Sequence, residues 1–118
     1  MEIVEQLINR YCSGVSYTID LNSEDYGEVE QNPLRISLGR PFLELTIEEQ
    51  TYVVLHEIAH VLRDGITTEK KAVGHDDTFY YRYLIPLSKM HGISKKVCRD
   101  IEQIWPEEYE GDSWTLYS

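Results

Sequence analysis

Apolar side chains point in nearly every direction around one stretch of the chain, residues 45–65. Thr46 can cap the start of a helix here, and Glu49 three residues later completes a capping box. Gly65 can take the left-handed conformation that ends a helix. A helix that is apolar almost all round is buried, so the pattern predicts a central, buried helix. Its apolar residues are Val53, Val54, Leu55, Ile58, Ala59, Val61 and Leu62.

Before this helix, the pattern changes from helical to alternating spacing. Residues 2–12 repeat apolar side chains at the spacing of a short amphipathic helix. Residues 15–21 then alternate strictly between apolar and polar, and residues 34–38 alternate again. This alternation predicts two half-buried strands. Residues 27–30 are a candidate for one further short strand.

After the central helix, the pattern indicates two more helices. The first should begin at Asp76 or Asp77, either of which can act as a cap, and Pro86 should end or kink it. Ser94 can cap the last helix, which should stop at Pro106. The core-facing residues expected are Phe79, Tyr83, Leu84 and Leu87 in the first of these helices, and Val97, Cys98, Ile101, Ile104 and Trp105 in the second.

These elements predict an α+β fold. It would contain an N-terminal helix, a small, mostly antiparallel sheet, the central helix and two further helices. The length of 118 residues is enough for one domain with a sizeable core and too short for two. We therefore expect a single domain over residues 1–118, with an acidic tail at residues 106–118.

The charge and the cysteines restrict the possible partners and compartment. A net charge of −10 argues against direct nucleic-acid binding, which needs a basic surface, and is compatible with a basic protein partner. No apolar run approaches the roughly 20 residues of a membrane span, and the acidic N-terminus does not fit a signal peptide. Cys12 and Cys98 do not make a disulfide framework, so we expect a cytoplasmic location. The oligomeric state does not follow from the sequence.

The central helix carries His56-Glu57-Ile58-Ala59-His60, which is the pattern His-Glu-x-x-His. Histidines four residues apart lie on the same helix face, so His56 and His60 can bind one zinc ion. Glu57 projects from the next position and suits a general base that acts on a metal-activated water. In the alternative interpretation, both histidines are hydrogen-bonded core residues and Glu57 pairs with Arg63.

A catalytic zinc site needs a third protein ligand. His75 lies at the expected junction between a loop and the following helix, from which it can fold back onto the central helix. Carboxylates also bind zinc, so Glu69, Asp76 and Asp77 are alternatives. His91 lies at an expected helix end, where it suits the C-terminal dipole better than a metal site.

The segments LHEIAHVLRDG and GHDDTF resemble the SprT-like and other small zincin-like zinc metallopeptidases of phage and bacterial genomes. The resemblance implies that His56, His60 and His75 bind zinc. It also implies that Glu57 is the catalytic base and that Phe79 packs beneath the site. An N-terminal helix and a small sheet before the metal-binding helix are further implications.

This resemblance covers roughly residues 14–90 and is incomplete. SprT-like proteins of the DNA-repair type are basic and often carry a zinc ribbon, whereas this chain is acidic and has none. The segment FYYRYLIP is similar to the Phe-to-Pro segment of ImmA/IrrE-like peptidases. In those proteins the third ligand is a Glu four residues before the Phe, and the corresponding residue here is His75.

The sequence therefore predicts a zinc-dependent metallopeptidase that hydrolyses peptide bonds in a protein or peptide. Tyr80, Tyr81 and Tyr83 are candidates for stabilising the oxyanion. Two other classes stay open. One is a non-catalytic, zinc-binding zincin that acts as a protein-binding or regulatory module. The other is an acidic decoy of a nucleic-acid-binding protein, which the acidic segment at residues 100–112 suggests.

The substrate is expected to bind along the strand at residues 34–38, because only a few residues separate this strand from the central helix. An extended peptide can add to an exposed sheet edge through backbone hydrogen bonds. Arg35, Ile36 and Ser37 are the candidate substrate-binding residues, with selectivity also expected from the loop at residues 65–74. A strand that is paired at both edges would contradict this model.

Overall fold

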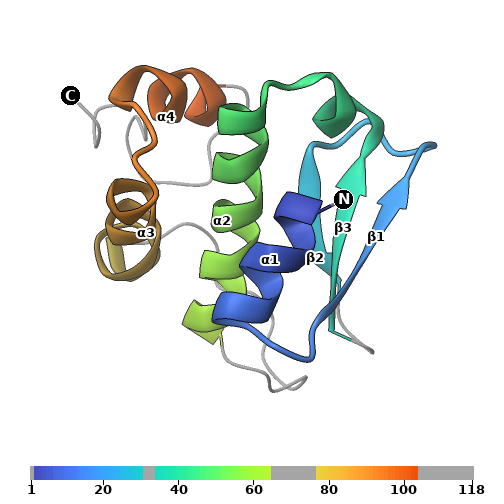
Figure 1. The fold of residues 1–118 in the computed structure, drawn as a ribbon, viewed down its shortest axis with the longest axis horizontal. Coiled ribbons are helices and arrows are strands. Elements are labelled where there is room, and N and C mark those ends of the chain that lie inside the picture. Colours follow the sequence, from blue (N-terminus) through green and yellow to red (C-terminus); the bar gives the residue numbers. More distant parts are fainter. Residues whose placement is uncertain (1, 31–33, 65–76, 104–118) are drawn as a thin grey trace.

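The computed structural model describes residues 2–30, 34–64 and 77–103 (Figure 1). The central helix α2 lies between two groups of elements. The sheet and α1 pack on one side of it, and η2, α3 and α4 pack on the other. The elements in chain order are α1 (Glu2–Tyr11), β1 (Ser16–Asp20), β2 (Gly27–Glu30), β3 (Arg35–Gly39), the 3₁₀-helix η1 (Arg40–Glu44), α2 (Ile47–Asp64), the π-helix η2 (Thr78–Leu84), α3 (Ile85–Met90) and α4 (Lys95–Glu102).

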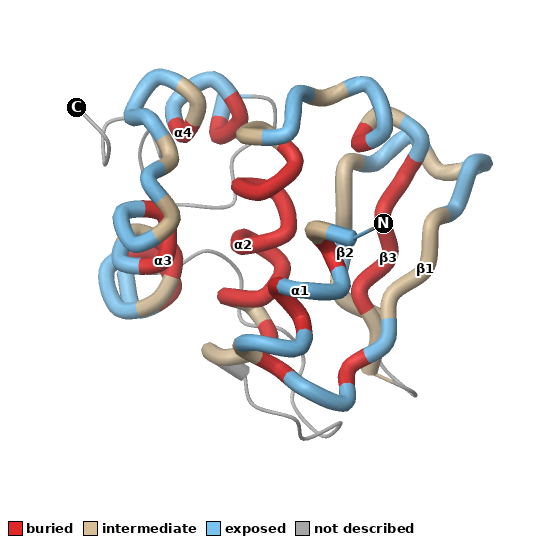
Figure 2. Tube along the Cα trace, viewed as in Figure 1, coloured by how far each residue is buried: buried red, intermediate tan, exposed pale blue. Residues whose placement is uncertain are grey.

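Helix α2 begins with the capping box that the sequence predicts. The backbone N–H of Thr46 donates to Oε1 of Glu49 at 2.9 Å, and the N–H of Glu49 donates to Oγ1 of Thr46 at 3.2 Å. The middle of the helix is the centre of the core, and Figure 2 shows it buried through several consecutive turns. The prediction of a central, buried helix is confirmed. Its fully buried residues are Tyr52, Val53, Val54, Leu55, Ile58 and Ala59.

The three strands form a mixed sheet in the order β1-β3-β2. Strand β1 runs parallel to β3, with Tyr17 opposite Ile36, and β2 runs antiparallel to β3, with Val29 opposite Ile36. The α+β class is confirmed, including the short strand at residues 27–30. The expectation of a mostly antiparallel sheet is not met, because one of the two strand pairs is parallel.

The position of β3 corrects the substrate model. This strand is central, and its two neighbours occupy both of its edges. Ile36 and Ser37 are buried, and Arg35 forms an ion pair with Glu30 of β2. The prediction that a peptide adds to the edge of this strand is therefore wrong. The model fails because residues 27–30 form β2, which pairs with β3 and covers the edge that was expected to be open.

A close backbone approach requires the glycine at the end of β3. The N–H of Gly39 donates to the carbonyl of Tyr26 at 3.2 Å, and the N–H of Arg40 donates to the carbonyl of Ser23 at 3.0 Å. A Cβ atom on Gly39 would lie 1.8 Å from the carbonyl oxygen of Asp25. The segment between β1 and β2 thus folds against this end of β3 and positions the start of β2.

The helix after residue 77 differs from the α-helix that the sequence predicts. Residues 78–84 form a π-helix, and the N–H of Ile85 donates to the carbonyl of Tyr80, five residues back. Pro86 lies in the first turn of α3 and cannot donate a backbone hydrogen bond. The wider turn buries Tyr80, whereas Tyr83 is only half-buried. The π-helix therefore places two consecutive aromatic side chains, Phe79 and Tyr80, in the core.

Helix α4 follows the prediction closely. Ser94 is its N-cap and accepts a hydrogen bond from the N–H of Val97 at 3.2 Å. Cys98 and Ile101 are buried on the face that was expected to contact the core. Ile104, Trp105 and the acidic tail at residues 106–118 lie outside the described residues. No described helix is both long enough and apolar enough to cross a membrane.

Candidate metal centre

Helix α2 brings three potential metal-binding side chains together. His56, Glu57 and His60 each offer one ligand atom, and these atoms all lie within 4.8 Å of one another. Nε2 of His56 is 4.0 Å from Oε1 of Glu57, and the imidazole rings of His56 and His60 are 5.0 Å apart between centroids. The helical spacing of the motif therefore produces the cluster that the sequence predicts.

The cluster is buried at one end and half-buried at the other. His56 is 1% exposed and Glu57 is 3% exposed, whereas His60, one turn later, is half-buried. Burying the carboxylate of Glu57 and the imidazole of His56 costs free energy unless they are paired or bind a metal. Imidazole nitrogens and a carboxylate oxygen are also ordinary zinc ligands. This donor set fits a divalent metal ion such as zinc.

Phe79 supports both histidines from one side. Its ring centroid lies 4.3 Å from that of His60 and 5.0 Å from that of His56, and the side chain is fully buried. Packing against a buried aromatic ring restricts the rotamers of both imidazoles. The expectation that Phe79 packs beneath the site is confirmed.

A fourth polar side chain, Glu102 at the end of α4, reaches the opposite edge of the His56 ring. Its Oε1 atom lies 3.5 Å from Nδ1 of His56 and accepts a hydrogen bond from Tyr52 at 2.5 Å. Its Oε2 atom accepts a hydrogen bond from Tyr80 at 2.8 Å. Burial raises the pKa of Glu102, but His56 and the two hydroxyl groups outweigh burial, so the pKa is lowered overall.

Glu102 was missed in the sequence, although its spacing gives a signal. It is four residues after Cys98 and therefore lies on the same helix face. A charged residue on the apolar face of a helix requires a buried partner. The partners come from α2 and η2, which are distant in sequence, so this signal reveals a buried carboxylate but not what it contacts.

Strand β2 approaches the cluster from the sheet side. A Cβ atom on Gly27 would lie 3.3 Å from Cγ of Glu57 and 3.4 Å from Cγ1 of Val53. The absence of a side chain at Gly27 therefore lets the strand pass directly beside Glu57. Among the described residues, β2 pairs only with β3, so its other edge is unpaired.

Several predicted site residues lie outside the described residues. These are His75, the predicted third ligand, and its alternatives Glu69 and Asp76. Asp77 is described at the N-cap position of η2, but it makes no capping hydrogen bond with its side chain. The candidate metal cluster found among the described residues does not include Asp77. The third ligand therefore stays a prediction.

His91 lies in a different environment. It is the C-cap residue of α3, and its Nε2 atom is 2.6 Å from the hydroxyl oxygen of Tyr11. The position at a helix end agrees with the sequence interpretation. Burial and the nearby charge of Arg10 lower the pKa of His91.

The two cysteines are not part of the candidate metal cluster found among the described residues. Cys12 and Cys98 are free and buried. Burial raises the pKa of Cys12 to about 11 and that of Cys98 to about 12. Burial therefore favours the protonated, less reactive thiol at both positions.

The three tyrosines considered for oxyanion stabilisation have different surroundings. Tyr80 is buried and donates its hydroxyl proton to Glu102, as described above. Tyr81 is 59% exposed, and Tyr83 is half-buried with Arg82 over its ring. Because Tyr80 is hydrogen-bonded to Glu102, its geometry favours a supporting role over direct contact with substrate.

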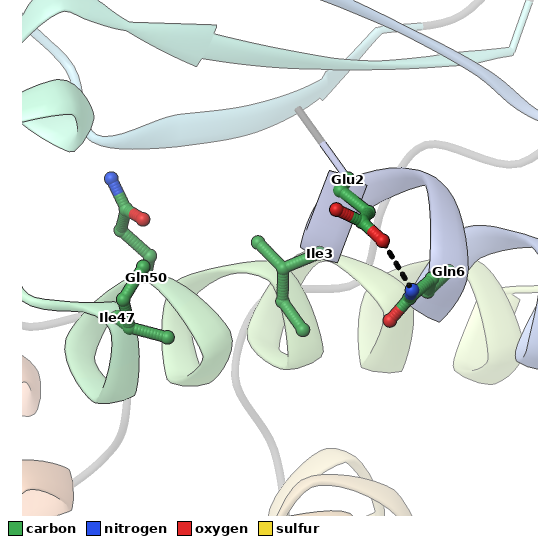
Figure 3. Close-up of a pocket in the computed structure, with 5 residues that line it drawn as sticks. All are labelled: Glu2, Ile3, Gln6, Ile47 and Gln50. Carbon is green, nitrogen blue, oxygen red and sulfur yellow. Dashed lines mark hydrogen bonds between the residues drawn. The ribbon is translucent and has the colours of Figure 1, made fainter.

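An open pocket of about 440 Å³ lies between α1 and the start of α2 (Figure 3). Glu2, Ile3, Gln6, Ile47 and Gln50 line it. Gln6 donates to Glu2 at 3.3 Å, and Gln50 donates to the carbonyl of Phe42 at 3.0 Å. Gln50 precedes His56 by six residues, or about 9 Å along the helix, so this pocket is separate from the metal-binding cluster.

The fold is similar to that of a solved metallopeptidase. Comparison with protein-family models finds no match, and neither does comparison with curated proteins. Among solved structures, the metallopeptidase zymogen of Pyrococcus abyssi abylysin is similar, with a TM-score of 0.54 and 20% sequence identity over 81% of this chain and 89% of that chain. The chain therefore shares the overall fold of that structure. The structure adds to this likeness a His-Glu-x-x-His cluster with the geometry of a candidate metal site.

Proposed function

We propose that this protein is a zinc-dependent metallopeptidase that hydrolyses peptide bonds in a protein or peptide. The observation that carries the proposal is the cluster of His56, Glu57 and His60 on a buried helix, with all ligand atoms within 4.8 Å. The metallopeptidase-like fold supports the same conclusion. SprT-like and ImmA/IrrE-like peptidases are the families proposed from the sequence.

His56 and His60 would hold the zinc ion, with His75 as the proposed third ligand. Bound zinc would polarise the scissile carbonyl group and lower the pKa of a water molecule at the site. Glu57 follows His56 directly, and its Oε1 atom is 4.0 Å from Nε2 of that residue. This carboxylate would accept a proton from the attacking water and pass it to the leaving amine. Phe79, which packs against both rings, would keep the two imidazoles oriented during this transfer.

The peptide substrate is proposed to bind along the unpaired edge of β2. This strand passes beside Glu57 at Gly27, and β3 is enclosed by its neighbours. An extended peptide on this edge would form backbone hydrogen bonds with β2 and run close to the proposed base. This proposal keeps the expectation that the substrate pairs with a sheet edge, but the strand is β2 and not β3.

The proposed function is tested by a Glu57→Gln variant. The substitution keeps the size of the side chain and removes the base. Hydrolysis should fall by about 10²–10⁴-fold, which is the usual contribution of a general base. Bound zinc should stay at one ion per chain. A proteomic cleavage screen identifies a peptide substrate for the rate measurement, and metal analysis of the purified protein measures zinc.

Glu44→Gln is the matched control, because Glu44 is exposed and precedes α2. It should change neither hydrolysis nor zinc content. If the wild-type protein binds zinc but cleaves no peptide, the non-catalytic zinc-binding module is favoured. Salt-sensitive binding to a basic protein that persists after zinc removal would favour the acidic decoy.

A further inference from the structure

Helix α4 is attached to α2 at both of its ends. At its start, the N–H of Ser94 donates to Oε2 of Glu48 at 2.8 Å. At its end, Glu102 reaches Tyr52 and His56, which are one turn apart on α2. Figure 1 shows α4 beside the N-terminal half of α2, and the two helices are in contact. The fold therefore fixes the position of the Glu102 backbone relative to His56.

The carboxylate of Glu102 is itself held by two hydroxyl groups. Tyr52 donates to Oε1 and Tyr80 donates to Oε2, so each oxygen has its own donor. Glu102 is 2% exposed, and the two tyrosines are also buried. Hydrogen bonds to an ionised acceptor are stronger than those between neutral groups, and they fix the plane of the carboxylate. This plane brings Oε1 to the Nδ1 edge of His56.

The two nitrogen atoms of His56 then face different groups. Nδ1 is 3.5 Å from Oε1 of Glu102, and Nε2 is 4.0 Å from Oε1 of Glu57 on the metal-binding side. An ionised carboxylate only accepts hydrogen bonds, so it favours a proton on Nδ1. With that proton in place, the neutral ring directs the lone pair of Nε2 toward the metal-binding cluster. A shift of about 0.5 Å would shorten the contact with Glu102 to ordinary hydrogen-bond length.

We propose that Glu102, oriented by Tyr52 and Tyr80, is a positioning residue that selects the metal-binding tautomer of His56. The inference rests on the proposed function, because it assigns a role at the same metal centre. A carboxylate behind a metal-binding histidine fixes the ring orientation and raises the basicity of the ligand nitrogen. Glu102 itself does not contact the metal in this arrangement.

Zinc affinity tests the role of Glu102. In Glu102→Gln the amide keeps the size of the side chain but can donate a hydrogen to Nδ1, which removes the preference for one tautomer. The affinity for Zn²⁺, measured by competition with a chromophoric chelator, should fall by about 10–100-fold. Asp100→Asn is the matched control on the same helix. Its exposed carboxylate pairs with Lys96, and the zinc affinity of this variant should equal that of the wild type.

The tautomer of His56 provides a second test that needs no variant. ¹⁵N chemical shifts of the ring are measured in the metal-free, full-length protein at a pH where the ring carries one proton. The proton should reside on Nδ1. A proton on Nε2 would overturn the proposal, even if Glu102→Gln fails to fold. Tyr80→Phe should weaken zinc binding in the same direction but less than Glu102→Gln.

The outcomes separate this inference from the proposed function. Equal zinc affinity of Glu102→Gln and the wild type would refute the role of Glu102 and leave the metallopeptidase proposal intact. Loss of all zinc from Glu102→Gln, as in His56→Ala, would make Glu102 a direct ligand and also overturn the positioning role. A wild-type protein that binds no zinc would refute the proposed function itself.

Discussion

His56 and His91 are both linked to tyrosine hydroxyl groups, His56 through Glu102 and His91 directly, yet their surroundings differ in other respects. His56 lies in the middle of a long helix and is enclosed by α2, η2 and α4, with carboxylates at both nitrogen atoms. His91 ends a short helix at the surface, where Tyr11, Met90 and Arg10 surround it. The candidate metal-binding histidine therefore differs from His91 in having a second imidazole one turn away and a buried carboxylate behind it.

The largest difference between these regions is expected in zinc binding. His56→Ala should abolish stoichiometric zinc, because it removes one of the two imidazoles in the cluster. His91→Ala should keep one zinc ion per chain, and His75→Ala tests the predicted third ligand in the same assay. Metal analysis after dialysis measures all three. Stoichiometric zinc in His56→Ala would show that the metal lies elsewhere.

Two glycines allow a sharper comparison, because Gly27 lies beside Glu57 and Gly92 lies beside His91. In Gly27→Ala the new methyl group would crowd Glu57, and a displaced catalytic group can lose up to about 100-fold in rate. Gly92 follows His91 and has a φ angle of +66°, so Gly92→Ala should cost about 1–2 kcal/mol of stability. We expect Gly27→Ala to reduce peptide hydrolysis at unchanged zinc content.

Gly92→Ala controls for general destabilisation. Its expected loss of stability is similar to the roughly 1–3 kcal/mol that overpacking should cost in Gly27→Ala. Its rate of hydrolysis should match that of the wild type. The assay compares initial rates well below the unfolding temperature of each variant. Equal losses of rate in both variants would mean that stability, and not the placement of Glu57, limits hydrolysis.

The two tyrosine contacts should also differ in their contribution to stability. Tyr80→Phe removes a hydrogen bond to the buried, ionised Glu102, which should cost about 1.5–3 kcal/mol. Tyr11→Phe removes a part-buried contact with His91, which should cost about 0.5–1.5 kcal/mol. Urea unfolding of the metal-free proteins measures both. A larger loss in Tyr11→Phe would reverse the relative importance of the two regions.

The features that were predicted correctly depend on local sequence. The capping box of Thr46 and Glu49 involves residues three apart, and the His56–His60 pair follows from the geometry of a single helix. The short strand at residues 27–30 was also visible as a local pattern. Each of these features depends on residues that lie within one or two helical turns of each other, or within a few residues of one strand.

The features that were missed depend on contacts between distant segments. Strand β3 pairs with β1 on one side and with β2 on the other, so β2 is an edge strand. No local sequence pattern predicts this strand order. Tyr80 is buried because residues 78–84 form a π-helix, whereas α-helical spacing favours Tyr83. The contact between Glu102 and His56 joins residues that are 46 positions apart. The substrate model failed for the same reason, since it assumed the sheet order.

The smallest expected effect is a change in stability with pH near His91. The pKa of this histidine is lowered in the folded protein, first by burial and then by Arg10. Above the ordinary histidine value of 6.5, the ring is neutral in both the folded and the unfolded states, so it adds no pH dependence. As the pH falls below this value, the unfolded state binds the proton first, and the free energy of unfolding decreases until the folded pKa is passed. His91→Asn should remove this decrease. Urea unfolding of the metal-free wild type and variant is measured between pH 7.5 and 5, in steps of ~0.5 pH units. The difference between the two curves of unfolding free energy against pH is the contribution of His91. Parallel curves would show that His91 has the same pKa in both states, and a steeper decrease in His91→Asn would reverse the sign of the proposed shift.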